Sequence, residues 1–295
     1  MNNTTSVAAP PRRSNEDPSR RRRGKEAART IVLEPGAAEL NPRRAALLDK
    51  SLIQALGVAI PVILLLLWQL AATQNWIDVR FFPAPSTILS NWGDLGSLYW
   101  EHLWASTQRV VQGFLLGSAA GLLCGLAIGR LTIVRKALEP LIVALYSVPK
   151  LAILPLLLLI FGIGETSKVL LIAISVYFIV LINTVGALEA VAIGHLEAAK
   201  SFGLSRVDTV RHVIIPSALP QIFVGLRLAA GVAVLVIVGA EFVAADRGLG
   251  YLIWNSWNLG IPSYMYVGIT SIAVLGVIMT FILRGLERFL VPWQH

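Results

Sequence analysis

Six long apolar stretches constrain the fold of this chain more than any other feature. They cover about residues 52–72, 110–128, 138–163, 169–188, 222–243 and 265–283. A helix needs about 20 mostly apolar residues to cross the hydrocarbon core of a bilayer. With 56% hydrophobic and 14% charged residues, the chain has too little polar surface to cover itself in water as a soluble enzyme does. The sequence therefore predicts an all-α membrane protein with six transmembrane helices.

Basic residues ahead of the first apolar stretch indicate the orientation. Of the 25 Lys and Arg residues, 11 lie within residues 1–50, and the predicted inner loops hold more of the others than the outer loops do. Cytoplasmic segments carry such an excess, so we expect both termini in the cytoplasm after six crossings. We interpret residues 1–50 as a disordered basic tail beside anionic lipid and residues 51–295 as the transmembrane domain. The net charge of +8 is thereby explained without a nucleic-acid partner.

The third apolar stretch contains helix-breaking residues and a charge. Pro149 and Pro155 predict a kinked or broken helix that lines a pore, and Gly162 and Gly164 follow at its end. Lys150 is a basic residue set well inside a predicted span, and charges at that depth face a cavity or a partner. It either attracts an anionic solute or pairs with a carboxylate or with backbone carbonyls. These residues are the first candidates for a pore or gate.

A glycine stripe marks the second apolar stretch. Glycine recurs there at every fourth position, and each glycine disfavours the helix by roughly 1 kcal/mol relative to alanine. Small residues on one face allow two membrane helices to approach closely. We expect a neighbouring helix, from this chain or from a second copy, to pack on the stripe, which consists of Gly113, Gly117, Gly121, Gly125 and Gly129.

Charged residues near the predicted outer ends of the spans suggest a second set of contacts. Arg109 and Lys168 are assigned to outer loops. Glu241 is either a gate element or the partner of Arg247, and Glu165 is expected to form a surface ion pair with Lys168, which would contribute little stability.

The polar interval between the fourth and fifth stretches, residues 189–221, is longer than an ordinary connector. A run of helix-forming residues stops at Gly203, a typical C-terminal glycine in the left-handed conformation. Ser205 with Asp208 three residues later predicts the start of a second helix, which is expected to end before Pro216. The interval therefore predicts two short helices on the inner face.

The same interval resembles the EAA signature of ATP-binding-cassette importer permeases. Glu197, Ala198 and Ala199 are followed at matching intervals by Gly203 and by the segment that ends at Pro216, with Val213 and Ile215 as conservative departures. In that family this segment is the coupling helix that docks into a cleft of the ATPase subunit. The resemblance therefore implies that Glu197, Ala198, Ala199, Gly203 and Pro216 form the ATPase contact.

Further motifs are similar to the sulfonate, taurine, nitrate and bicarbonate branch of these permeases. They include residues 149–156 and 161–168, Asn183 with Thr184, residues 225–227, Glu241, and residues 248–251. The resemblance implies a type I, MetI-like fold and a multi-pass location in the inner or plasma membrane. It also implies a homodimer, two ATPase subunits and an extracytoplasmic solute-binding protein. Asn183 and Glu241 join the pore or gate candidates.

The resemblance implies import of a small anionic solute, with a thiamine-pyrimidine precursor or an aromatic acid as alternatives. The sequence has no Gly-x-x-x-x-Gly-Lys-Ser/Thr loop, so ATP and Mg²⁺ are expected on a partner and no cofactor on this chain. A single cysteine, Cys124, excludes a disulfide framework. No catalytic or metal-ligating cluster is evident, which argues against an intramembrane enzyme. An ion-coupled secondary transporter remains an alternative, although no internal repeat is evident.

Overall fold

A computed structural model describes residues 42–294, and of residues 42–54 and Gln294 only the backbone. It falls into two units, residues 1–64 and residues 65–295, and each is described by itself. Of the first unit the described part is helical and belongs to α3, Pro42–Thr73. The predicted tail of residues 1–50 thus lies mostly outside the described residues, and its last part is the beginning of α3.

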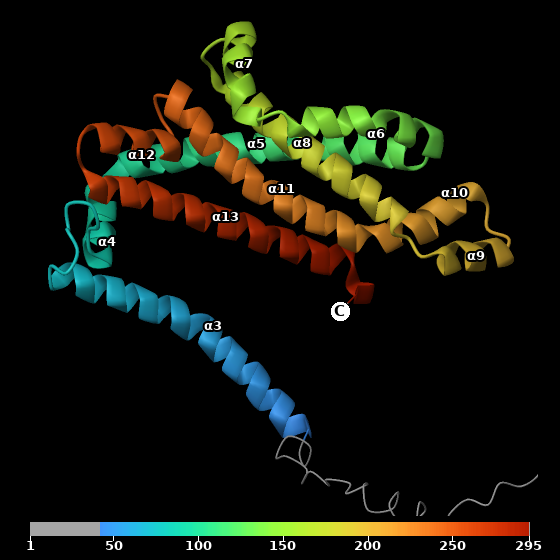
Figure 1. The fold of residues 1–295 in the computed structure, drawn as a ribbon, viewed down its shortest axis with the longest axis horizontal. Helices are drawn as coiled ribbons and strands as arrows, with labels where there is room; N and C mark the ends of the chain where they lie inside the picture. Colours follow the sequence, from blue (N-terminus) through green and yellow to red (C-terminus); the bar gives the residue numbers. More distant parts are fainter. Residues whose placement is uncertain (1–41, 295) are drawn as a thin grey trace, which may run out of the picture. The chain divides into compact units, whose positions relative to one another are not determined.

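The long helices of the second unit run side by side (Figure 1). The helix bounds are α4, Pro85–Asp94; α5, Gly96–Gly129; α6, Thr132–Ser147; α7, Leu154–Phe161; α8, Glu165–Glu189; α9, Ile193–Ser201; α10, Arg206–Thr209; α11, Ile215–Ala244; α12, Leu249–Asn258; and α13, Pro262–Leu290. Short turns complete the order, namely 3₁₀ turns at Lys150–Ile153 and Pro292–Gln294 and a π-helical turn at Val210–Ile214.

Five helices of the described residues are long and apolar enough to cross a membrane: the part of α3 from Ala55, α5, α8, the continuous segment Arg206–Ala244 and α13. The bent pair formed by α6 and the segment Lys150–Phe161 would be a sixth if it is counted as one span. Most of these helices extend beyond the predicted stretches. For example, α5 begins at Gly96 instead of near residue 110, because the turns ahead of the apolar run bury residues such as Tyr99 and His102 and continue the helix.

Helix α8 is at the centre of the second unit, with α5 packed along one side and α11 along another. Its apolar side chains are buried at these contacts, where Leu171, Ile172 and Val176 are fully covered. The core continues along α11 through small residues such as Ala229 and Ala233. Burial of apolar and small side chains between these three helices positions the loops at both ends.

Candidate coupling and gating site

Helix α9 lies at one end of the second unit, and α12 lies at the opposite end (Figure 1). Helix α9 ends in a Schellman motif. The Leu204 amide donates to the Ala199 carbonyl at 3.1 Å, and the Gly203 amide donates to the Lys200 carbonyl at 3.0 Å. Gly203 has φ +71°, the left-handed conformation that the sequence predicts. The chain therefore reverses sharply after α9.

The surface of α9 is largely free of contacts within the unit. Ala199 is its one buried residue, whereas Glu197 and Ala198 are exposed. The exposed fraction of Phe202, just after the helix, is 85%, and Ile193 and Val207 are also exposed. Exposed apolar side chains on and next to a short helix are typical of a surface that docks onto another protein.

Helix α10 begins with the predicted cap and then departs from the prediction. The Ser205 hydroxyl accepts from the Asp208 amide at 3.2 Å, as a capping residue does. The second helix does not end before Pro216, however, and this expectation was wrong. The π-helical turn leads directly into α11, whose first turn contains Pro216, a position where the missing proline N–H breaks no helical hydrogen bond. The coupling loop is therefore continuous with the long helix α11.

The third apolar stretch is broken at Pro149, as predicted. Helix α6 ends at Ser147, and the following segment, Lys150–Phe161, leaves at an angle of 82°. Pro149 lies in the break with an extended backbone, which excludes it from a continuous helix. Pro155 causes no second break, contrary to expectation, because it occupies the first turn of α7. Gly162, with φ +79°, ends α7.

Lys150 secures this break. Its ammonium group donates to the carbonyls of Leu145 at 2.8 Å, Tyr146 at 3.0 Å and Val148 at 2.8 Å, and it lies 4.8 Å from the ring centroid of Phe178. The carbonyls at the end of a helix lack helical partners, so a cation there satisfies them. The sequence left two roles open for Lys150, attraction of an anionic solute or pairing with a carboxylate or with backbone carbonyls. In the structure Lys150 pairs with backbone carbonyls.

We therefore expect Lys150→Gln to lower thermal stability without weakening solute recognition. A neutral side chain loses the charge-assisted hydrogen bonds to the end of α6, at a cost of about 1.5–3 kcal/mol. The measurement is the thermal transition of the purified protein together with the KM for transport. A raised KM at unchanged stability would instead support the role in attracting an anionic solute.

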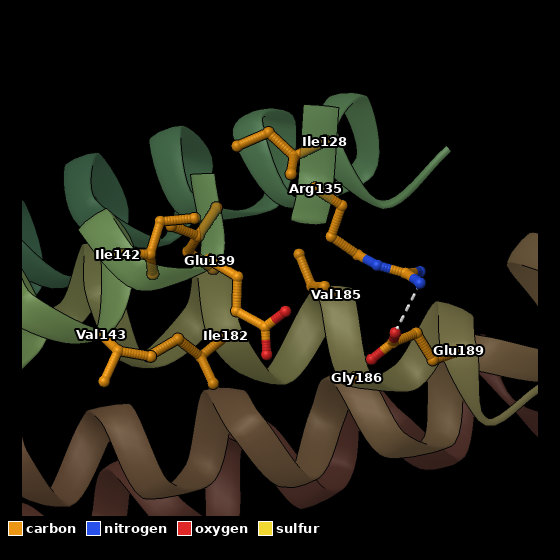
Figure 2. Close-up of a pocket in the computed structure, with 10 residues that line it drawn as sticks. Ile128, Arg135, Glu139, Ile142, Val143, Ile182, Val185, Gly186 and Glu189 are labelled. Atoms are coloured by element: carbon orange, nitrogen blue, oxygen red, sulfur yellow. Dashed lines mark ion pairs between the residues drawn. The ribbon is translucent and has the colours of Figure 1, made fainter. Parts of the chain in front are cut away.

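A cavity of roughly 210 Å³ separates α6 from α8 on the side of the coupling loop. Figure 2 shows Arg135 of α6 reaching across its mouth to Glu189, the last residue of α8, with an ion-pair distance of 2.8 Å. Glu139 points its carboxylate into the same cavity (Figure 2). The pair is partly exposed and contributes little stability, but it connects α6 to the residue just ahead of the coupling loop.

The glycine stripe of α5 packs against α8 of the same chain. A Cβ atom built at Gly121 would lie 2.8 Å from the Tyr177 carbonyl oxygen, and one at Gly125 would lie 2.7 Å from Thr184 Cβ. Gly113, Gly117 and Gly129 meet α8 in the same way. Asn183, on α8, donates to the Ile179 carbonyl and packs against Gly225 of α11. It thus lies at the crossing of α8 and α11.

A buried ion cluster, which the sequence did not predict, lies at the other end of the unit. Arg109 is part of α5 and not of a loop, and only 1% of it is exposed. Its guanidinium contacts Glu165 through Nε and Nη2, and its Nη1 donates to Glu241 at 2.7 Å and to the Arg247 carbonyl at 2.7 Å. Glu241 therefore pairs with Arg109 and not with the Arg247 side chain.

The prediction that Lys168 lies in an outer loop was also wrong. Lys168 belongs to the first turn of α8 and is buried. Its ammonium group donates to the Gly164 carbonyl at 3.2 Å and lies 3.8 Å from Glu165. The expected surface pair of Glu165 and Lys168 is thus one edge of the buried cluster. Arg109 and Lys168 directly precede the predicted apolar stretches 110–128 and 169–188. Hydropathy alone therefore assigns both residues to loops.

Comparison with known proteins identifies the family of this chain. The family model described as "Binding-protein-dependent transport system inner membrane component" matches residues 113–292, from within α5 to just past the end of α13. The chain belongs to this permease family. As a member it is a transport subunit of the inner membrane and not an enzyme, and its apolar helices make it a multi-pass protein.

Several permeases are similar to this one over most of their length. The taurine transport system permease protein TauC of Escherichia coli is 35% identical over 246 residues, which cover 81% of this chain and 90% of TauC. A putative aliphatic sulfonates transport permease protein, SsuC of Bacillus subtilis, is 34% identical over 81% of this chain and 87% of its own. The nitrate import permease protein NrtB of Leptolyngbya laminosa is 30% identical over 85% and 96%, respectively.

Solved structures show the same fold in a distant permease. The MetNI methionine ABC transporter in an inward-facing conformation matches with a TM-score of 0.59 at 18% identity, over 67% of this chain and 98% of the other. This likeness establishes the MetI-like helical fold for the permease.

Proposed function

We propose that this permease is the membrane subunit of an ATP-driven importer and that α9 docks into a cytoplasmic ATPase subunit. The observation that carries the proposal is the exposed α9, which ends in the left-handed turn at Gly203 and presents Glu197 and Ala198. Because the loop continues without a break into α11, a displacement of α9 is transmitted to a long apolar helix. In this proposal Glu197, Ala198, Ala199, Gly203 and Pro216 form the coupling segment.

The proposed assembly contains two copies of the chain, two ATPase subunits with ATP and Mg²⁺, and an extracytoplasmic solute-binding protein. Six spans, with the bent pair counted as one, would leave both termini in the cytoplasm. Helix α6 has no buried residue, and α7 exposes Leu159 and Ile160. Such apolar surface requires lipid or a second copy, which supports a pore near the bent pair. Pro149, Lys150, Pro155, Gly162, Asn183 and Glu241 are the proposed pore or gate residues.

The proposed solute is a small anion of the sulfonate, taurine or nitrate type. The names of the relatives support this class. Importers of this design leave much of the selection to the binding protein, so few pore residues need to recognise the solute. A bicarbonate, a thiamine-pyrimidine precursor and an aromatic acid are the other solutes to be compared.

The test is uptake into proteoliposomes that contain the permease, its ATPase and its loaded binding protein. We expect uptake of a labelled sulfonate to require internal ATP and to persist when ionophores collapse all ion gradients. Unlabelled taurine, nitrate, bicarbonate and a pyrimidine serve as competitors that identify the solute. Uptake by the permease alone, driven by an ion gradient, would contradict the proposal and indicate a secondary transporter.

A further inference from the structure

The start of α12 is held by side chains from two other helices. The Gly248 amide donates to His102 Nδ1 at 3.0 Å, the Leu249 amide to the Ser106 hydroxyl at 2.7 Å, and the Gly250 amide to Glu241 at 2.8 Å. The first N–H groups of a helix have no partner within the helix, so these three bonds satisfy them. A carboxylate at this position also interacts favourably with the helix dipole. Helix α12 is thereby fastened to α5 and α11.

Arg109 connects this fastening to the beginning of α8. Its Nη1 contacts Glu241 and its Nε and Nη2 contact Glu165, so one guanidinium joins carboxylates from α11 and α8. Ser106, one turn earlier on α5, donates to both oxygens of Glu241 at 2.8 and 2.9 Å. A buried cation with this many charge-assisted bonds is strongly held in one geometry.

The two carboxylates that Arg109 contacts differ in their surroundings. The Glu241 side chain is 0% exposed, and both of its oxygens have other donors from rigid helices. The Glu165 side chain is 50% exposed and directly follows the turn of Gly162 and Gly164 that ends α7. Glu165 is thus the more accessible of the two carboxylates, and it lies next to the turn between α7 and α8.

We propose that Arg109 is a positioning residue for transport, permanently fixed to α12 by Glu241, and that its contact with Glu165 holds and releases the outer end of the bent pair. This inference rests on the proposed function. When Glu165 is held, the turn between α7 and α8 is tied through Arg109 and Glu241 to the start of α12. When Glu165 is released, the buried Lys168, 3.8 Å away, provides the carboxylate with a second cation. The bent pair can then pivot at the two glycines.

The decisive experiment compares Glu165→Gln with Glu241→Gln in the complete transporter with its ATPase. We expect Glu165→Gln to lower the thermal transition much less than Glu241→Gln does, because Arg109 retains Glu241 and the Arg247 carbonyl. Solute-free ATP hydrolysis should rise, and solute uptake per ATP should fall about tenfold or more, as loss of a charge-assisted contact to arginine implies. Glu165→Asp should restore part of this ratio. Glu241→Gln should lower the thermal transition as well.

Glu101→Gln is the matched control, because it also removes one negative charge. The Glu101 carboxylate is exposed and lies 4.0 Å from the Arg247 side chain. It should leave uptake per ATP unchanged. An uptake ratio in Glu165→Gln equal to that of the parent would overturn the inference, as would a loss of stability as large as that in Glu241→Gln. A parent transporter that shows no ATP-dependent uptake would contradict the proposed function instead, so the two failures are distinguishable.

Discussion

Replacing Gly121 with leucine will prevent α5 and α8 from packing and will remove most of the folded protein from the membrane. A Cβ atom at this position lies 2.8 Å from the Tyr177 carbonyl and 2.9 Å from Val180 Cβ, so the obstacle includes backbone. A backbone carbonyl in a helix cannot move aside as a flexible side chain does. The two helices must separate, and the expected loss of stability is about 3 kcal/mol or more, at the upper end for overpacked sites.

The measurement is the yield and thermal transition of the purified permease in detergent. Gly231→Ala is a suitable control, because Gly231 is a helical glycine in α11 and a Cβ atom there would meet nothing within 4 Å. Alanine favours a helix, so the control should be neutral or slightly stabilising. If Gly121→Leu had the same thermal transition as the parent, the close packing of α5 on α8 would be contradicted.

Replacing Gly203 with valine should abolish uptake while the membrane helices remain folded. Valine at φ +71° is strained by about 1–2 kcal/mol, and α9 is too short to withstand that strain. The Schellman bonds to Ala199 and Lys200 are expected to open, so that α9 no longer presents Glu197 in a fixed position. Uptake in proteoliposomes should fall by more than tenfold, with hydrolysis by the ATPase no longer stimulated by the loaded binding protein.

Gly194→Ala separates this effect from a general disturbance of the loop. Gly194 lies in the first turn of α9, has an ordinary helical conformation, and has open space around a built Cβ atom. This variant should transport like the parent. The proposed coupling role would fail if Gly203→Val and Glu197→Lys both retained full stimulation by the loaded binding protein.

Signals that act over a few residues were read correctly from the sequence. The left-handed turn at Gly203 and the cap at Ser205 depend on backbone geometry that these residue types favour by themselves. The break at Pro149 is local as well, since proline lacks an N–H and clashes with the preceding helical turn. The same reasoning failed at Pro216, because proline is also accommodated in the first turn of a helix and the sequence alone does not distinguish these two positions.

The buried cluster shows where such reasoning stops. Arg109 is separated in sequence from Glu165 by 56 positions and from Glu241 by 132 positions, and no local pattern relates them. A window of hydropathy treats a charge at the edge of an apolar run as the end of the span. The signal that was present, a charge on each of three neighbouring spans at the same end, becomes informative only when the helices are placed side by side.

The sequence by itself determined that the chain is helical, where most of its membrane helices lie, and which segment on one face has the shape of a coupling loop. These properties follow from hydrophobicity, glycine and proline, which act within one turn or one span. Only the tertiary structure decided that the glycine stripe meets α8, that Lys150 caps α6, and that Arg109 of α5 joins α8 to α11. The physical reason is that a buried charge or a bare backbone surface is satisfied by whichever group the fold brings to it, and that group is distant in sequence.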